Sequence, residues 1–274
     1  MSDATTFVHL TDLHLVPPGG SADHPCAGNA DRLRKAVSMI GAIRPLPDFI
    51  ALSGDIADRG DIDSYRLARE VLGESGLPVV HALGNHDTRQ RFYAGMLDRE
   101  RDLEAPYCHD HVFGDAHVIA LDTSVAGKVA GALCQPQFAF LGEALARHPR
   151  RTKVIVMHHA PWIGQGIGHG WETIGPQDSE SLADAIHGHK VAGILTGHVH
   201  YDRVSIWNGV PVVTTTGLYN ANDILHNDGL RFVAGASFAL CTLRDGALTV
   251  AYVPLPSDRR ELAVIDEETV RSFV

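Results

Sequence analysis

Residues 191–200 read VAGILTGHVH, an apolar run followed by a Gly-His-x-His sequence. The apolar run has the length and composition of a buried strand. Four other apolar runs are also followed at once by residues that bind metals or move protons: 7–14 (FVHLTDLH), 49–55 (FIALSGD), 79–87 (VVHALGNHD) and 153–159 (KVIVMHH). In open α/β sheets, functional sites gather beyond the carboxyl ends of the strands. The five segments are therefore expected to bring their polar side chains to one site.

The segments between these strands show the apolar periodicity of helices. Helices are predicted at 31–43, 65–72, 138–146 and 181–186, and a further strand at 117–121. Strands that alternate with helices indicate parallel or mixed pairing, with the helices packed on the faces of the sheet.

After His200 the pattern changes to consecutive strands, predicted at 204–207, 210–216, 232–243 and 248–253. Asn208-Gly209 and Asp245-Gly246 are typical two-residue hairpin turns. We predict an α/β (α+β) fold with mixed sheets flanked by helices, in a single domain over residues 1–274. Residues 201–255 are expected to complete the second sheet and could form a small cap or a dimer contact. The polar tail from Pro256 could be peripheral or contact another subunit in a homo-oligomer.

Composition narrows the classes of partner. The net charge of −10 disfavours a general grip on a nucleic-acid backbone, so stable nucleic-acid binding is not expected. The amino-terminal residues lack the pattern of a signal peptide, and no apolar run approaches the roughly 20 residues that span a bilayer. We therefore expect no membrane association and a cytoplasmic location. The four cysteines are scattered and are expected to be reduced.

The residues after the strands predict a pair of metal ions. They are carboxylates, an amide and imidazoles without a thiolate, a set that suits Mn, Fe, Zn or Co better than a structural zinc site. Asp55 is expected to bridge the two ions. The other ligands divide into two sets: Asp12, His14 and His200 for one ion, and Asn85, His158 and His198 for the other. Two ions about 3.5–4 Å apart clamp the attacking and leaving oxygens of an in-line displacement at phosphorus.

The ordered set Asp-x-His, Gly-Asp, Gly-Asn-His-Asp, His and Gly-His-x-His over residues 7–200 resembles the calcineurin-like metallophosphoesterase superfamily. It is most similar to the bacterial class III cyclic-nucleotide and glycerophosphodiester phosphodiesterases. The resemblance implies a four-layer α-β-β-α sandwich. It also implies that Asn85 is a ligand and that the adjacent His86 contacts phosphate or protonates the leaving group.

The activity that follows is hydrolysis of small phosphodiesters by a metal-activated hydroxide. 3′,5′-Cyclic nucleotides and glycerophosphodiesters are the expected substrates, and Asp55, His86 and Asp87 are the expected catalytic residues. Two alternatives use the same residues. One is a broad-specificity phosphomonoesterase or phosphonate monoesterase, and the other is a non-catalytic, metal-binding regulatory module.

Some positions stay open at the level of sequence. His158 is preferred over His159 as ligand because it comes directly after a strand, and His159 would then lie behind the ligands or contact substrate. Asp87 could hold His86 in a productive tautomer or cap the next helix. His169, in a glycine-rich loop, and Asn220, soon after the Gly-His-x-His segment, are further candidate substrate contacts.

Overall fold

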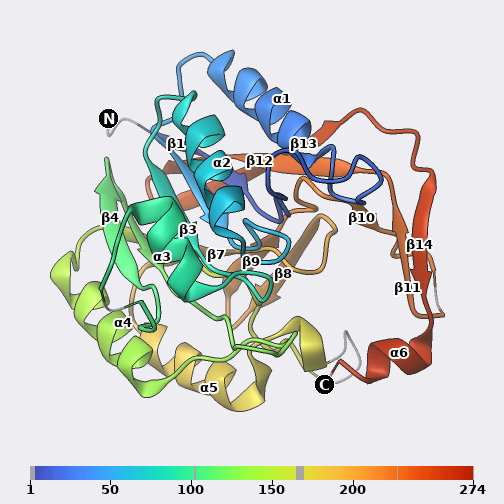
Figure 1. Cartoon of the computed structure of the whole chain (residues 1–274). Coiled ribbons are helices and arrows are strands. Elements are labelled where there is room, and N and C mark those ends of the chain that lie inside the picture. Colours follow the sequence, from blue (N-terminus) through green and yellow to red (C-terminus); the bar gives the residue numbers. More distant parts are fainter. Residues whose placement is uncertain (1–3, 102, 165–169, 227, 274) are drawn as a thin grey trace.

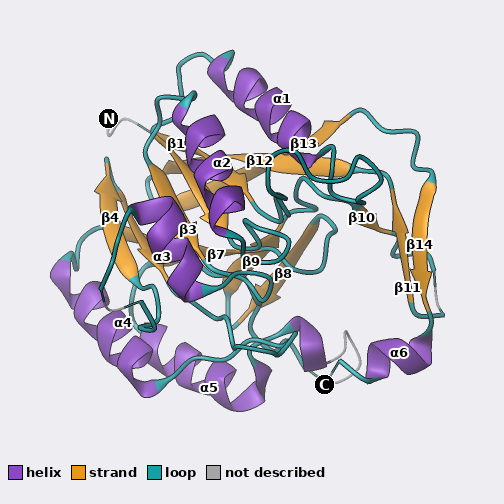
Figure 2. Cartoon of the chain, viewed as in Figure 1, coloured by secondary structure: helices purple, strands orange, loops and turns teal. Residues whose placement is uncertain are grey.

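The computed structural model describes residues 4–101, 103–164, 170–226 and 228–273. Two large sheets face each other in the middle of the molecule, with helices on both outer sides (Figures 1 and 2). A third, small sheet lies at the edge of this sandwich beside the carboxyl terminus. Within the described ranges, no helix combines the length and apolar composition needed to cross a membrane.

The five-stranded sheet is built around the amino-terminal strand. Its order is β13 (Ala247–Leu255), β12 (Ala236–Arg244), β1 (Thr5–Leu10), β2 (Phe49–Ser53) and β3 (Val79–Ala82). Strands β1, β2 and β3 are parallel, whereas β12 and β13 pair antiparallel. Three predicted strand ends therefore meet at one edge of this sheet.

The six-stranded sheet supplies the other two strand ends. Its order is β4 (His109–Phe113), β5 (Ala116–Ala120), β6 (Thr152–Val156), β7 (Val191–Thr196), β9 (Val210–Thr214) and β8 (Arg203–Trp207). The four central strands are parallel, and β4 and β8 are antiparallel edge strands.

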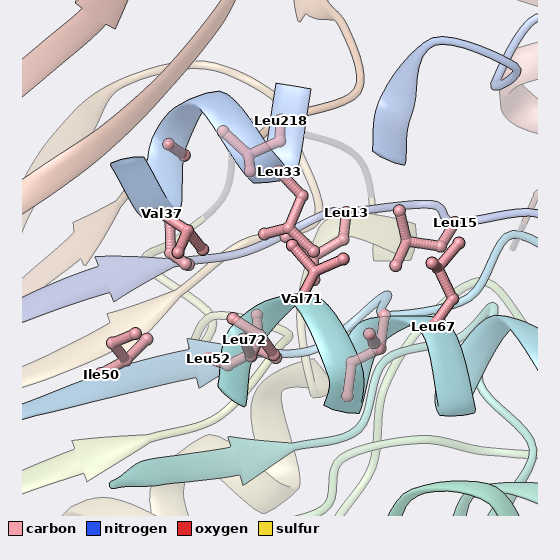
Figure 3. Packing of buried hydrophobic residues seen from close by; sticks show 14 of the residues in the cluster. Leu13, Leu15, Leu33, Val37, Ile50, Leu52, Leu67, Val71, Leu72 and Leu218 are labelled. Carbon is pink, nitrogen blue, oxygen red and sulfur yellow. The ribbon is translucent and has the colours of Figure 1, made fainter. Parts of the chain in front are cut away.

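Helices cover the outer face of each large sheet. The five-stranded sheet packs against α1 (Asn29–Gly41), α2 (Ile62–Gly73) and α3 (Arg89–Leu97). Figure 3 shows part of this layer, where Leu33 of α1 lies beside Leu13 and Leu72 of α2 lies beside Leu52 of β2. The six-stranded sheet packs against α4 (Gln135–Arg147) and α5 (Gly175–Ile186). These layers confirm the predicted α-β-β-α sandwich.

The core between the two sheets contains a stack of three aromatic rings. The ring of Phe49 lies 4.7 Å from that of Phe7 in the same sheet and 4.3 Å from that of Phe113 in the other sheet. Alanine and valine fill much of the remaining space between the sheets. The aromatic stack therefore joins the two layers whose strand ends carry the predicted ligands.

The chain after His200 departs from the expected arrangement. Its strands are shared among three sheets: β8 and β9 join the six-stranded sheet, and β12 and β13 join the five-stranded one. Two strands, β11 (Leu230–Val233) and β12, occupy the segment predicted as one strand at 232–243. They are separated near Gly235, where an added Cβ atom would lie only 2.8 Å from Cβ of Ala221.

Strands β10 (Ala221–Asn222) and β14 (Glu261–Ile265) of the small sheet and the last helix come from segments in which no strand or helix was predicted. The sheet consists of β10, β11 and β14, all antiparallel, and α6 (Glu267–Arg271) follows. The tail is thus ordered against β11. A single domain over 1–274, a dimer contact and a homo-oligomer stay predictions.

Replacing Phe49 with alanine is expected to lower the free energy of unfolding by about 3–5 kcal/mol, because the buried ring fills the space between the sheets. Urea unfolding followed by circular dichroism measures the change. The control is Val204→Ala on β8, where the side chain is 53% exposed and a loss under about 0.5 kcal/mol is expected. A loss of the same small size at both positions would contradict this account of the core.

Candidate metal centre

The five predicted strand ends converge. His158 follows β6 and His14 follows β1, yet both approach the same carboxylate oxygen, Oδ2 of Asp55. His158 Nε2 lies 3.2 Å from it and His14 Nε2 lies 3.5 Å from it. His200 Nε2 lies 3.2 Å from Oδ1 of Asp12. Asp55 therefore stands between a histidine of each predicted ligand set, as a bridging ligand must.

The turns that carry the ligands have an uncommon backbone conformation. Residues other than glycine rarely have a positive φ, and such strained residues cluster at functional sites. Five of the seven predicted ligands have one: Asp12 (50°), His14 (43°), Asp55 (50°), His198 (77°) and His200 (55°). The left-handed turns direct these side chains away from the strand direction and into the common centre.

Two glycines make this close approach feasible. A Cβ at Gly84 would lie 2.2 Å from Oδ1 of Asp55, and one at Gly197 would lie 2.4 Å from Oδ2 of Asp12. Any larger residue at either position would displace a ligand carboxylate. The glycine before Asn85 and the one before His198 are therefore required by the site itself.

One ring nitrogen of each ligand histidine is held by a hydrogen bond, which leaves the other nitrogen to bind a metal ion. His158 Nδ1 donates to the carbonyl of Ser53 at 2.7 Å, and His198 Nε2 donates to the carbonyl of Trp171 at 3.0 Å. His200 Nδ1 bonds Oδ1 of Asn220 at 2.6 Å. Partners of this kind set the tautomer and orientation of metal-binding imidazoles.

The residues present fit a pair of metal ions. Buried polar atoms nearly always have a hydrogen-bond partner. Within the described ranges, three buried atoms that face the centre have none: His14 Nε2, His158 Nε2 and Asn85 Oδ1. All three are predicted metal-binding atoms, and they come from both ligand sets. Together with the nitrogen and oxygen donors of the remaining ligands, they form two half-sites that share Asp55.

The carboxylates of the centre keep their charge despite burial. Burial acts to raise the pKa of Asp12, but His200 and His14 hold it below its ordinary value. Burial likewise acts to raise the pKa of Asp55, but His158 lowers it, and the pKa of Asp55 is well below its ordinary value. The carboxylate of Asp55 in turn outweighs burial and raises the pKa of His158 to about 9. Both carboxylates are thus in the ionised form that metal ligation requires.

His86 lies on the rim of the centre with an exposed side chain. Its backbone N–H donates to Oδ1 of Asp55 at 2.9 Å, and its ring Nδ1 donates to the carbonyl of Asp58 at 2.8 Å. The ring Nε2 is therefore the nitrogen left for substrate, and His86 lines the pocket above the ligands.

Neither role expected for Asp87 matches its contacts. Its carboxylate accepts the backbone N–H of Ile56, Ala57 and Gly84 and the hydroxyl of Tyr65, instead of pairing with the His86 ring. The helix cap of α3 is Thr88. Burial, together with the charge of Asp55, raises the pKa of Asp87 to about 6. Asp87 ties the loop after β2 to the loop after β3, a contact between segments that no local pattern predicts.

The family model of the calcineurin-like phosphoesterases matches residues 5–202, which include all seven predicted ligands. The chain belongs to this family. The predicted resemblance is thereby confirmed, and the family's match ends where the strands of the carboxyl-terminal third begin.

The relatives of this phosphoesterase include bacterial phosphodiesterases. It is 31% identical to a probable cyclic nucleotide phosphodiesterase of Rhodococcus erythropolis, over 80% of this chain and 72% of the relative. It is 29% identical to a cAMP/cGMP dual specificity phosphodiesterase of Mycobacterium tuberculosis, over 98% of this chain and 82% of the relative. Among solved structures, a dimetal phosphatase from Danio rerio has the same fold, with a TM-score of 0.67, 15% identity and coverage of 97% and 100%.

The remaining candidates of this phosphoesterase are the three residues predicted to contact substrate. His159 is fully buried, with Nδ1 bonded to the Thr123 hydroxyl at 2.8 Å and Nε2 donating to the carbonyl of Val129 at 2.9 Å. With both nitrogens engaged, it does not suit the predicted substrate contact. Asn220 lines the pocket, but its carbonyl oxygen is used to orient His200. His169 lies outside the described residues.

Sequence reasoning gave no role to Asp58 and did not predict that the Trp171 carbonyl holds His198. Asp58 Oδ1 lies 3.4 Å from His14 Nδ1, and its backbone carbonyl holds His86, so one residue orients both histidines. The only feature of the sequence that points to a role for Asp58 is its position three residues after Asp55. Trp171 contributes a carbonyl, an atom that every residue type has, and nothing in the sequence marks it.

Manganese content should separate His158 from His159. His158→Ala is expected to retain about one manganese ion per chain where the native protein retains about two, since one half-site loses a ligand. The matched variant His159→Ala is expected to keep both ions, at a cost in stability. Plasma mass spectrometry of dialysed, manganese-loaded protein gives the counts. Loss of an ion from His159→Ala alone would reverse the assignment.

Proposed function

We propose that this chain is a metal-dependent phosphodiesterase whose substrates are small phosphodiesters, with 3′,5′-cyclic nucleotides foremost. The observation that carries the proposal is the position of Asp55, whose Oδ2 lies within 3.5 Å of a histidine from each half-site. A shared carboxylate suits two ions at the spacing needed for in-line displacement at phosphorus. The names of the relatives from Rhodococcus and Mycobacterium support the substrate class.

The chain would hold one ion with Asp12, His14 and His200, the other with Asn85, His158 and His198, and both with Asp55. When bound, the ions would polarise the phosphoryl oxygens and lower the pKa of the attacking water. The protein contributes ligands that are already oriented, since Ser53, Trp171 and Asn220 each fix one histidine ring. Little reorganisation is then needed when the substrate binds.

His86 is the residue placed to protonate the leaving oxygen. Its Nδ1 donates to the carbonyl of Asp58, so that in the protonated ring Nε2 carries the transferable proton. The backbone N–H of the same residue donates to Asp55, which holds His86 beside the predicted metal ligands. An alkoxide such as the ribose 3′-oxygen is a poor leaving group and benefits from this proton.

The identity of the metal ions follows from the ligand atoms. Imidazole, carboxylate and amide ligands without thiolate suit Mn, Fe, Zn or Co, and we propose two ions of these kinds per chain. We also propose a cytoplasmic location.

His86→Ala is expected to lower kcat for 3′,5′-cyclic AMP by about 10²–10⁴-fold, the usual contribution of a general acid. For bis(p-nitrophenyl) phosphate the loss is expected to be under about tenfold, because nitrophenolate leaves without a proton. Steady-state kinetics with manganese-loaded protein measures both values.

The control for this variant is His111→Ala, an exposed histidine of β4, for which unchanged kinetics are expected. Equal losses of kcat on the two substrates would show that His86 only contacts phosphate and is not the acid. No hydrolysis of either diester by the native protein would remove the proposed activity itself.

A further inference from the structure

A pocket of about 610 Å³ opens above the metal ligands. Its floor is polar and is formed by His14, Asp55, Asn85, His86 and His200. The wall formed by the three-stranded sheet and the carboxyl-terminal segment is apolar, and its side chains are Leu230, Phe232, Leu262, Ala263, Ile265 and Phe273. We call these six residues the apolar wall. Pockets of this volume hold ligands the size of a nucleotide.

The strand register explains how the apolar wall forms. Leu230 pairs with Ile265, and Phe232 pairs with Ala263, across the antiparallel strands β11 and β14. Side chains alternate between the faces of a strand, so these two pairs share one face. Arg231, between them, forms an ion pair with Asp223. One face of the small sheet is thus apolar and lines the same pocket as the predicted metal ligands.

The apolar wall is joined to the ligand loops by a small core of its own. Val270 of α6 is fully buried and packs with Trp171 and Val199. Val199 lies between the ligands His198 and His200, and the carbonyl of Trp171 holds the His198 ring. The ring of Phe273 meets the Trp171 ring at 6.0 Å. The position of the wall is therefore set relative to the metal centre.

The chemistry of the pocket favours one class of organic group. Among the described residues that line it, the only carboxylate is the ligand Asp55, and there is no lysine or arginine. A glycerol or ethanolamine group placed against the apolar wall would lose water without gaining partners. A flat, uncharged ring would instead bury its face against Phe232 and the neighbouring aliphatic side chains.

We propose that the apolar wall is the specificity surface of the enzyme and receives the planar ring of a nucleoside. The inference rests on the proposed phosphodiesterase function and narrows its substrate class. The phosphate would lie over the metal ligands on the polar floor, and the base against β11, β14 and Phe273. The enzyme therefore selects 3′,5′-cyclic nucleotides over glycerophosphodiesters.

The test compares two substrates on manganese-loaded protein. Phe232→Ala is expected to lower kcat/KM for 3′,5′-cyclic AMP by about 10- to 100-fold, mainly through KM, as removal of an aromatic stacking partner does. Hydrolysis of glycerophosphoethanolamine is expected to change less than about twofold. Leu262→Asn, at a side chain that is 43% exposed, gives a second variant that does not threaten folding, and a smaller loss in the same direction is expected.

Phe140→Ala on α4 is the matched control, since this half-buried phenylalanine packs in the core beside α5 and lies away from the pocket. Metal content is measured for every variant, because the ring of Phe232 lies 6.2 Å from that of His200. Equal losses on both substrates, or an unchanged kcat/KM for cyclic AMP, would overturn the inference.

Binding separates failure of this inference from failure of the proposed activity. Calorimetric titration with 5′-AMP and with glycerol 3-phosphate uses two ligands that share a phosphate group and differ in the base. The native protein is expected to bind 5′-AMP more tightly, and Phe232→Ala is expected to remove that preference. Absence of turnover with the preference intact would refute the activity alone. Turnover without any preference would refute the role of the apolar wall alone.

Discussion

The carboxylate of Asp55 is the contact on which the remainder of the site depends. It receives His14 from the five-stranded sheet and His158 from the six-stranded sheet, and its other oxygen accepts the backbone N–H of His86. A buried carboxylate is costly unless its charge is compensated. The compensation here comes from both layers, so the site exists only when the two sheets are packed. The aromatic stack of Phe7, Phe49 and Phe113 therefore supports the centre as well as the core.

The ligand turns are held by contacts that are independent of any ion. The carboxylate of Asp87 accepts backbone N–H groups from the loops after β2 and β3, and so fixes two of the loops that carry ligands. Leu13 and Leu15 are buried on either side of His14 and anchor its turn in the core. Such support explains how the positive φ of His14 persists. The ions are then expected to enter a site that is already shaped.

Much of this arrangement could be predicted from sequence, for a specific physical reason. Buried strands followed by polar residues give a local signal, and the topology of parallel strands brings those residues together. Contacts between distant segments gave no such signal. Partners at Thr123 and Val129 decide the role of His159, and the loop at Ile56 decides that of Asp87. Strand β14 was missed because its side chains are mostly exposed, so its order comes from pairing with β11.

Chemistry and selectivity are supported by different parts of the fold. The ligands are each tied by backbone or side-chain contacts within the two large sheets, whereas the apolar wall depends on one strand pair and on the packing of Val270. A change at an exposed wall residue such as Leu262 alters only what the pocket receives. A change at Trp171 or Val270 is expected to affect metal binding as well, because the Trp171 carbonyl holds His198. Substrate preference and metal geometry are therefore linked at Trp171, whose carbonyl holds His198, and at Phe232, whose ring lies 6.2 Å from that of His200.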